Sequence, residues 1–424
     1  MPAFGALVAE PLFLLADSAI VGHLGTPQLA GLGVAGALLA TSVSVCVFLA
    51  YGTTAAVARR VGAGDLRAAI AQGVDGVWLA LGLGCLLAAA LVAAAGPLVD
   101  AFGTSAAATP YALTYLRVSA LGLPAMLSVL AATGVLRGLQ DTVPPLVVAT
   151  LGAVANIALN LVLVYPAGLG IAGSALGTVL AQTGMAAAFL TVVVRGARRE
   201  HASLRPDLPG IRAAGRAGVP LIVRTVTLRA ALLLATYVAA AAGTVAVAAH
   251  QVAFTIWLFL SLMLDAVAIA GQAIVGRYLG ASDVEGTRAA TRRMVEWGVG
   301  AGIVLGVVLL ALRAVFVPLF TEDPAVRELL GSVLVVAAVA QPVCGVVFAL
   351  DGVLLGAGDA AFLRTWTLLA AVVGFLPLIW ASLAFGWGLA GIWSGLAAFM
   401  LVRLVAVLLR VRSGRWAVTG VTPT

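Results

Sequence analysis

Apolar stretches long enough for membrane-spanning helices recur along the whole chain, with short polar segments between them. A helix of about 20 apolar residues crosses a hydrocarbon core of about 30 Å. The stretches are apolar throughout rather than alternating with a period of two, which favours helices over the strands of a membrane barrel. We predict about twelve spans, at residues 3–24, 29–53, 72–98, 110–133, 143–166, 169–194, 217–241, 247–275, 294–316, 327–350, 361–384 and 388–411.

The composition agrees with this pattern. Apolar residues make up 62% of the 424 residues and charged residues only 10%, and the mean hydropathy is +1.14. A soluble chain would carry about a quarter charged residues. The sequence therefore predicts an all-α integral membrane protein.

The second half of the chain repeats the first at a constant offset of 218 residues. Residues 134–141 (GVLRGLQD) and 352–359 (GVLLGAGD) share five of eight positions, and 168–177 and 386–395 share five of ten. Six spans per half return the chain to its starting side, so both halves have one orientation. We predict two pseudo-symmetric six-helix bundles, a lobe at 1–194 and a lobe with a short tail at 217–424, joined by a linker at 195–216.

The basic residues indicate the orientation of the chain in the membrane. All 24 are arginines, and most lie beside alternate loops, in the linker or in the tail; Arg59, Arg277, Arg403 and Arg410 are examples. The positive-inside rule then places both termini and the linker in the cytoplasm, with the protein in the inner (plasma) membrane. The arginines are spread over short loops, so the net charge of +7 does not indicate a nucleic-acid partner.

Ionisable groups inside a span are costly and are candidates for function. Those in or near the predicted spans are Glu10, Asp17, Arg224, Arg229, His250, Asp265 and Asp351. Counting 1.5 Å per residue puts Asp17, Asn156 and Thr178 about 10 to 14 Å below the outer ends of their helices. Asn160 lies one turn from Asn156 on the same face.

Asp17, Asn156, Asn160 and Thr178 are hard oxygen ligands, suited to a proton or Na⁺ rather than to a soft metal. We predict that they form a cation-coupling site in the first lobe. The alternative for Asn156 and Thr178 is that they only join helices, as polar residues often do in membrane bundles.

A second set of charges falls at one level in the other lobe. Arg224 and Arg229 lie about 10 and 18 Å from the cytoplasmic start of their span, and Asp265 lies between these levels. Unpaired charges there would be costly, so we predict a paired cluster. It would be either a structural ion pair or a gating or substrate-binding group.

The sequence contains no set of residues typical of catalysis. HExxH, GxSxG, Walker A and CxxC motifs are absent, and the three cysteines have no metal-binding spacing. We therefore expect no enzyme activity, no metal site and no cofactor. An internal repeat in a membrane protein is typical of a transporter. Because the sequence has no phosphate-binding loop, such transport would be driven by an ion gradient rather than by ATP.

Several segments together resemble multidrug and toxic compound extrusion (MATE) transporters of the DinF-like branch. They are EPLFLLADSAIVGHLGTPQLAGLG at 10–33, ARRVGAGD at 58–65, GVLRGLQDT at 134–142, AAHQVA at 248–253 and GQAIVGRYLGASD at 271–283. The resemblance spans both halves. It implies a two-lobed, monomeric antiporter that exports small cationic or amphipathic compounds across the bilayer by alternating access, in exchange for H⁺ or Na⁺.

The resemblance also implies a coupling site in the first lobe. Asp17, Asn156 and Thr178 match residues of that site in relatives, whereas Asn160 stands where relatives often have Asp. Asp17 would then be the one titratable group of the four, which favours a proton cycle. The alternatives are a flippase for lipid-linked precursors in the same superfamily, a membrane-integral enzyme, and a scaffold that transports nothing.

Overall fold

The computed structural model describes residues 16–421, and all its regular structure within that range is helical. The chain divides into two compact units, Met1–Gly218 and Val219–Thr424. Ten helical segments of the described residues are long and apolar enough to cross a membrane, and a bent pair of helices adds an eleventh. Most of the first predicted span, including Glu10, lies outside the described residues. Residues 16–22 of that span are helical.

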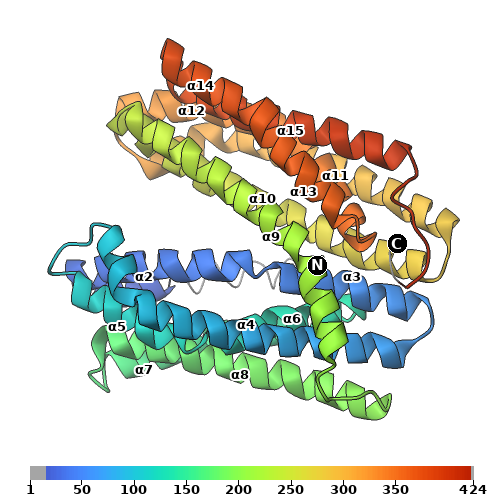
Figure 1. The fold of residues 1–424 in the computed structure, drawn as a ribbon. Helices are drawn as coiled ribbons and strands as arrows, with labels where there is room; N and C mark the ends of the chain where they lie inside the picture. The colour runs from blue at the N-terminus through green and yellow to red at the C-terminus, as the bar shows by residue number, and fades with distance from the viewer. Residues whose placement is uncertain (1–15, 422–424) are drawn as a thin grey trace. The chain divides into compact units, whose positions relative to one another are not determined.

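The helices of unit 1 follow one another with short turns (Figure 1). After residues 16–22 come α2 (Thr26–Val45), α3 (Phe48–Gly62), α4 (Leu66–Ala101), α5 (Thr109–Ala120), α6 (Leu123–Gly138), α7 (Val143–Val164) and α8 (Gly170–Arg199). Helix α9 (Leu208–Ala241) begins in unit 1 and continues into unit 2. Helical residues thus enter the predicted linker at 195–216 from both sides, and residues 200–207 lie between the two helices.

Unit 2 continues with α10 (Thr244–Gly280), α11 (Val284–Phe320), α12 (Pro324–Gly356), α13 (Ala360–Leu369), α14 (Leu376–Phe385) and α15 (Gly388–Arg412). A π-helical segment, Ala370–Phe375, joins α13 to α14, so these three pieces form one span.

The backbone follows the 218-residue repeat closely. Helix α10 begins and ends 218 residues after the start of α2 and the end of α3. Gly25 and Gly243 precede these helices with φ of 138° and 115°, a conformation that glycine adopts without strain. Asp65 and Asp283 each cap the next helix by accepting a backbone hydrogen bond, at 2.8 and 2.7 Å.

One pair of repeat mates behaves differently in the two units. Gly84 packs against Pro124 and Gly302 against Pro342, because a glycine in each case leaves room for the proline of the neighbouring helix. The sequence favours a bend at both prolines. In unit 1 the chain is bent by 49° between α5 and α6, just before Pro124. In unit 2 Pro342 lies inside the continuous helix α12, so the chain has no matching break there.

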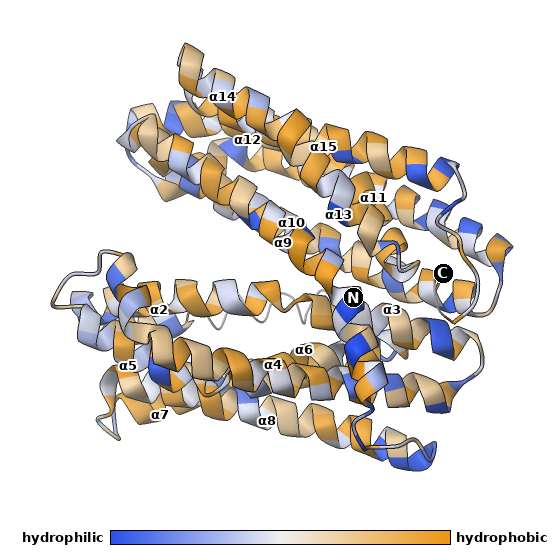
Figure 2. Ribbon diagram, in the orientation of Figure 1, coloured by the Kyte–Doolittle hydropathy of each residue, from blue (hydrophilic) through white to orange (hydrophobic). Residues whose placement is uncertain are grey.

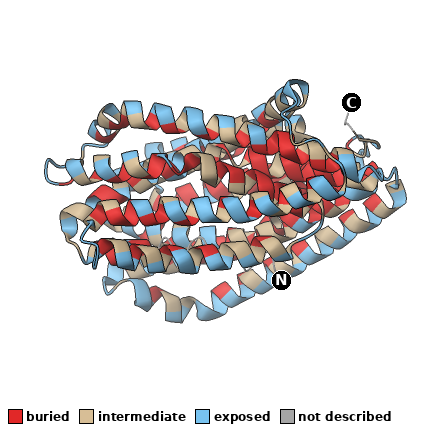
Figure 3. Cartoon of the chain, turned by 90° about the horizontal axis from the view of Figure 1, so that it is seen from below, coloured by how far each residue is buried: buried red, intermediate tan, exposed pale blue. Residues whose placement is uncertain are grey.

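The helices are apolar along their length, and hydrophilic residues gather towards their ends and loops (Figure 2). Buried positions run as stripes along the helices, next to exposed ones (Figure 3). Many exposed positions carry large apolar side chains, such as Leu86 at 65% and Leu233 at 70% exposure. Such surfaces suit hydrocarbon rather than water.

Candidate functional site

The carboxylate of Asp17 is buried in unit 1 and is held by three hydrogen-bond donors. Its side chain is 3% exposed. Tyr115 donates from α5 to Oδ2 over 2.9 Å, and Asn160 donates from α7 to Oδ1 over 2.9 Å. Ser174 of α8 donates to the same Oδ1. Three helices thus converge on one carboxylate, which is the arrangement that stabilises a buried charge by dipoles.

The neighbouring polar groups extend this contact into a chain of hydrogen bonds. Asn160 also donates to Oδ1 of Asn156 over 3.3 Å, and Asn156 donates to Thr178 Oγ1 over 3.1 Å. Asn156 and Asn160 are one turn apart on α7, and Ser174 and Thr178 are one turn apart on α8, so each pair faces the same way. All four residues predicted for this site therefore lie in one network. That they couple transport to an ion remains a prediction.

The local fold orients the helix of Asp17. Tyr165, just after α7, donates from its hydroxyl to the backbone oxygen of Ile20 over 2.9 Å. The helix ends near Gly22, and Gly25 then allows the turn into α2. Ile20 lies about one turn after Asp17. The hydrogen bond from Tyr165 therefore fixes the helix of Asp17 to the end of α7, the helix that supplies Asn160.

Tyr115 and Ser174 belong to the site and were not predicted. Both are largely buried, at 5% and 0% exposure. Hydroxyl residues are common in membrane helices, where most bond to the backbone of their own helix. The spacing of Ser174 four residues before Thr178 was the available signal. For Tyr115 the signal was a phenol inside the predicted span 110–133.

The charge of Asp17 is not balanced by a basic side chain of the described residues. Ion pairs among the described residues include those of Arg224 and Arg403 with Asp351, of Arg292 and Arg293 with Glu296, and of Arg410 with Asp359. Within the same residues, no group of three or more His, Cys, Asp or Glu side chains could hold a metal ion. What the arrangement can do is hold or release one proton, or offer one carboxylate and several neutral oxygens to a cation.

A charge cluster in unit 2 contains one of the predicted residues, Arg224, together with Asp351 and Arg403. Asp351 of α12 accepts from Arg224 Nη2 of α9 over 2.6 Å and from Arg403 of α15, both through Oδ2. Arg403 is 6% exposed, with its guanidinium 5.5 Å from the centre of the Phe399 ring. Its assignment to the cytoplasmic arginines was wrong, because its charge is paired inside the helix bundle.

The other two predicted members lie on α9 and α10. Arg229 is exposed and Asp265 is half-buried. The pairing of Asp265 with Arg224 or Arg229 stays a prediction, and the cluster that the structure adds to it is centred on Asp351.

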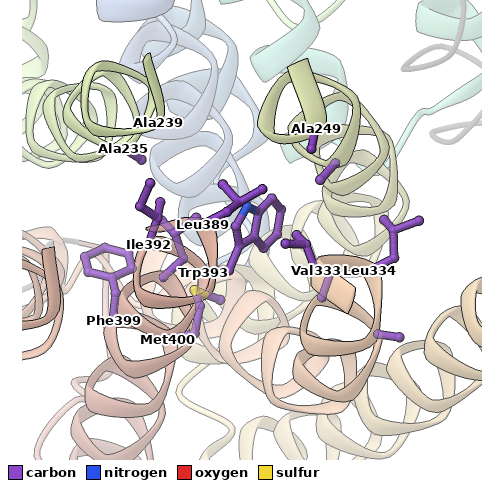
Figure 4. Packing of buried hydrophobic residues seen from close by; sticks show 14 of the residues in the cluster. Ala235, Ala239, Ala249, Val333, Leu334, Leu389, Ile392, Trp393, Phe399 and Met400 are labelled. Atoms are coloured by element: carbon purple, nitrogen blue, oxygen red, sulfur yellow. The ribbon is translucent and has the colours of Figure 1, made fainter. Parts of the chain in front are cut away.

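In unit 2, apolar residues occupy the positions that correspond to the Asp17 network. Adding 218 to the network residues leads to Ala235, Val333, Gly374, Leu378, Ile392 and Leu396. Ala235, Val333 and Ile392 belong to a large buried apolar cluster, part of which Figure 4 shows. The duplicated framework therefore carries the carboxylate network in one unit only.

Comparison with known proteins explains the repeat. A model of the MatE family matches residues 2–162 and again residues 220–380, and the bounds of the second match lie 218 residues after those of the first. Protein DETOXIFICATION 44, a chloroplastic protein of Arabidopsis thaliana, is 33% identical over 100% of this chain and 83% of its own length. DNA damage-inducible protein F of Escherichia coli is 29% identical, over 98% and 92%.

Solved structures show the same fold. The Vibrio cholerae MATE transporter VcmN in its bent form has a TM-score of 0.89 at 22% identity, covering 97% of this chain and 94% of that one. A MOP superfamily transporter from Pyrococcus furiosus, described as having a binding pocket of reverse polarity, has a TM-score of 0.86 at 22% identity, covering 98% and 94%. The two matches to the family model, one in each half, together cover well over half of the chain. The chain therefore belongs to the MatE family of multidrug and toxic compound extrusion transporters.

Proposed function

We propose that this membrane transporter is a secondary antiporter that exports small cationic or amphipathic compounds in exchange for H⁺, with Asp17 as the proton-binding group. The observation that carries the proposal is the buried Asp17 carboxylate, which accepts three hydrogen bonds and has no ion pair among the described residues. A carboxylate in a membrane span without a structural counter-charge is a functional candidate. Family membership makes transport rather than catalysis the activity, which removes the enzyme and the scaffold as alternatives.

Protonation of Asp17 requires a rearrangement of its neighbours. In the structure three donors point at the two carboxylate oxygens, so an added O–H has no acceptor until one donor turns away. Asn160 Oδ1 is buried and has no hydrogen-bond partner among the described residues. Rotating the Asn160 amide would present this oxygen to the protonated carboxyl group.

The same rotation would reverse the chain of amides. Asn156 would then donate to Asn160, and Thr178 would donate to Asn156 instead of accepting from it. Each residue has both a donor and an acceptor, so the reversed chain loses no hydrogen bond. The direction of hydrogen bonding between α7 and α8 would thus follow the protonation state of Asp17.

The charge at the site supports H⁺ rather than Na⁺ as the coupling ion. A dehydrated Na⁺ needs oxygen ligands that replace its hydration, and the network offers one formal negative charge because residue 160 is an asparagine. A proton neutralises Asp17 completely. Loss of that charge would weaken the attraction for a cationic substrate, so that proton binding from outside promotes substrate release there.

The relatives support the substrate class. Relatives of this chain include a probable multidrug resistance protein NorM of Thermotoga maritima, 24% identical over 98% of this chain and 91% of its own length. Multidrug export implies that the substrates are small molecules of varied structure and that the transporter works within the lipid bilayer. We propose that the protein acts as a monomer.

A flippase for lipid-linked precursors is the second candidate. The half-buried Arg224 and the buried Arg403, both paired with one carboxylate, favour it, because such precursors carry phosphate groups that arginine recognises. A structural relative is described as having a pocket of reverse polarity. A flippase would act on a lipid-linked anion and would not export a fluorescent cation.

Transport in proteoliposomes distinguishes these functions. Vesicles loaded with a fluorescent organic cation receive an inward H⁺ gradient or an inward Na⁺ gradient alone. We expect efflux with the H⁺ gradient and none with the Na⁺ gradient at equal pH. Efflux driven by Na⁺ alone would contradict H⁺ coupling, and movement of a lipid-linked pyrophosphate without cation efflux would identify the flippase.

We also propose the inner (plasma) membrane as the location, with both termini in the cytoplasm. The distribution of arginines over the loops supports this orientation. Alkaline phosphatase and fluorescent-protein fusions at the C-terminus test it: we expect a fluorescent and phosphatase-inactive fusion.

A further inference from the structure

A second buried polar group in unit 2 plays no part in the proposed transport cycle. His250 of α10 is 0% exposed, and its Nε2 lies 3.3 Å from Thr236 Oγ1 of α9. The Thr236 hydroxyl donates its one hydrogen to the backbone oxygen of Leu232 over 3.1 Å. It can therefore only accept from His250, which puts the imidazole hydrogen on Nε2 and leaves a lone pair on Nδ1.

Trp393 of α15 supplies the complementary group. Its ring centre lies 6.0 Å from that of His250, with the planes at 63°, and it is 2% exposed. Its Nε1 and His250 Nδ1 are both buried without a hydrogen-bond partner among the described residues. Indole nitrogen can only donate and Nδ1 here can only accept, so two adjacent rings present one donor and one acceptor.

Three helices meet at this place at one depth. Thr236, His250 and Trp393 lie 5, 6 and 5 residues from the nearest ends of α9, α10 and α15, or about 8 to 9 Å along each helix. Figure 4 shows the Trp393 indole among the apolar side chains of the cluster. A polar group left unpaired in such surroundings destabilises the fold, and here there are two.

We propose that His250 Nδ1 and Trp393 Nε1 form a binding site for one buried water molecule, which accepts from the indole and donates to the imidazole. Water is small enough for a fully enclosed site and has the required donor and acceptor, and buried waters typically bridge otherwise unpaired polar groups. The Phe254 ring stacks on that of His250 with centres 6.0 Å apart, and Trp393 belongs to the buried apolar cluster.

The place of this site within the repeat adds to the argument. Thr236 and Trp393 directly follow Ala235 and Ile392, the apolar counterparts of Asp17 and Ser174. The helices of Asp17 and Ser174 in unit 1 thus correspond to α9 and α15, which carry two of the three members of a neutral polar site in unit 2. The water would join α9, α10 and α15 without adding a charge.

The test observes the indole hydrogen of Trp393 in the full-length protein, ¹⁵N-labelled at tryptophan and held in lipid nanodiscs. Trp393→Phe assigns the resonance, and Trp297, which is 68% exposed, provides the reference indole. We expect a downfield, slowly exchanging Trp393 resonance with a dipolar cross-peak to water. A through-bond coupling between the two ring nitrogens without a water cross-peak would show a direct bond and overturn the proposal, as would an unbonded indole.

Two substitutions of His250 separate its two nitrogens. Asn places a polar atom near the position of Nδ1, and Gln places one near Nε2. We expect His250→Asn to keep the downfield Trp393 resonance and its water cross-peak, and His250→Gln to lose both. If both variants kept the downfield Trp393 resonance and its water cross-peak, the proposed site would be overturned.

The third change tests the hydrogen position on the imidazole. Thr236→Val removes the acceptor for Nε2–H while keeping the side-chain volume, and should move the hydrogen towards Nδ1. The ¹⁵N shifts of His250 report this directly, and the Trp393 cross-peak should change with them. An unchanged histidine spectrum would contradict the assigned roles.

Discussion

Asn160 places its side-chain oxygen directly over Gly177, so close that a methyl group on Gly177 would overlap it. The same amide donates to Asp17 over 2.9 Å. Gly177 of α8 thus provides the space in which the Asn160 amide faces the carboxylate, and the small side chain of one helix sets the orientation of a polar group on another.

Gly177→Ala should therefore impair transport by displacing Asn160. Overpacking of this kind costs about 1–3 kcal/mol, and we expect H⁺-driven efflux to fall by about tenfold or more, since 1.4 kcal/mol corresponds to a factor of ten. Gly184→Ala, on the same helix with open space at its Cα, is the matched control and should transport normally. Equal activity of the two variants would show that the amide is not held in this way.

Asp17→Asn should abolish coupled efflux and leave the protein folded. The amide keeps the shape of the side chain but cannot change its charge. Asp100→Asn, at an exposed position near the end of α4, is the control and should transport normally. The measurement is cation efflux from proteoliposomes under an H⁺ gradient, with a thermal melt of both variants. Full efflux by Asp17→Asn would exclude Asp17 as the proton-binding group.

Asn160→Asp should make transport sensitive to Na⁺. A second carboxylate next to Asp17 doubles the negative charge of the site and supplies a further charged oxygen ligand to replace the hydration of Na⁺. We expect a Na⁺ gradient to drive efflux in this variant. The double variant Asp17→Asn with Asn160→Asp restores a single charge and should lose that response; if it responds equally, charge number is not what selects the ion.

Asp351→Asn should destabilise unit 2 strongly. Removing one partner of a buried ion pair leaves charge uncompensated and typically costs about 3–5 kcal/mol, and here Arg403 is buried next to Asp351. We expect a clear loss of melting temperature and expression. Glu296→Gln, which breaks two ion pairs to arginines exposed by 84% and 75%, should change neither. Similar losses in both variants would show that burial is not the cause.

Asp265→Ala should lower the melting temperature if Asp265 pairs with Arg224 or Arg229. A second substitution, Arg224→Gln or Arg229→Gln, should then restore part of the loss, because it removes the charge left without its partner. Thermal melts of the single and double variants measure this coupling. If the losses of melting temperature in the single variants simply add in both double variants, Asp265 pairs with neither arginine.

Much of the fold follows from the sequence because the repeat constrains it. The constant offset anticipates that α10 has the same bounds as α2 and α3 together, shifted by 218. The grouping of Asp17 with Asn156, Asn160 and Thr178 also followed, since depth in a membrane helix depends only on residue count.

Other features could not be deduced in this way. Tyr115 and Ser174 are hydroxyl residues with many possible partners, and only the packing of α5 and α8 brings them to Asp17. Arg403 lies near the end of a span, where its charge is equally consistent with a loop; only its contact with Asp351 shows otherwise. The break before Pro124 has no counterpart at Pro342, although both prolines pack on a glycine.

The apolar residues that replace the carboxylate network in unit 2 have a thermodynamic consequence. With a single carboxylate at the Asp17 site, the proposed cycle exchanges one proton for one substrate molecule. For a monovalent cation that exchange is electroneutral, so membrane voltage contributes nothing and the pH difference alone drives export. Each pH unit then supports a tenfold substrate gradient, about 1.4 kcal/mol, and a neutral substrate would gain the voltage as well.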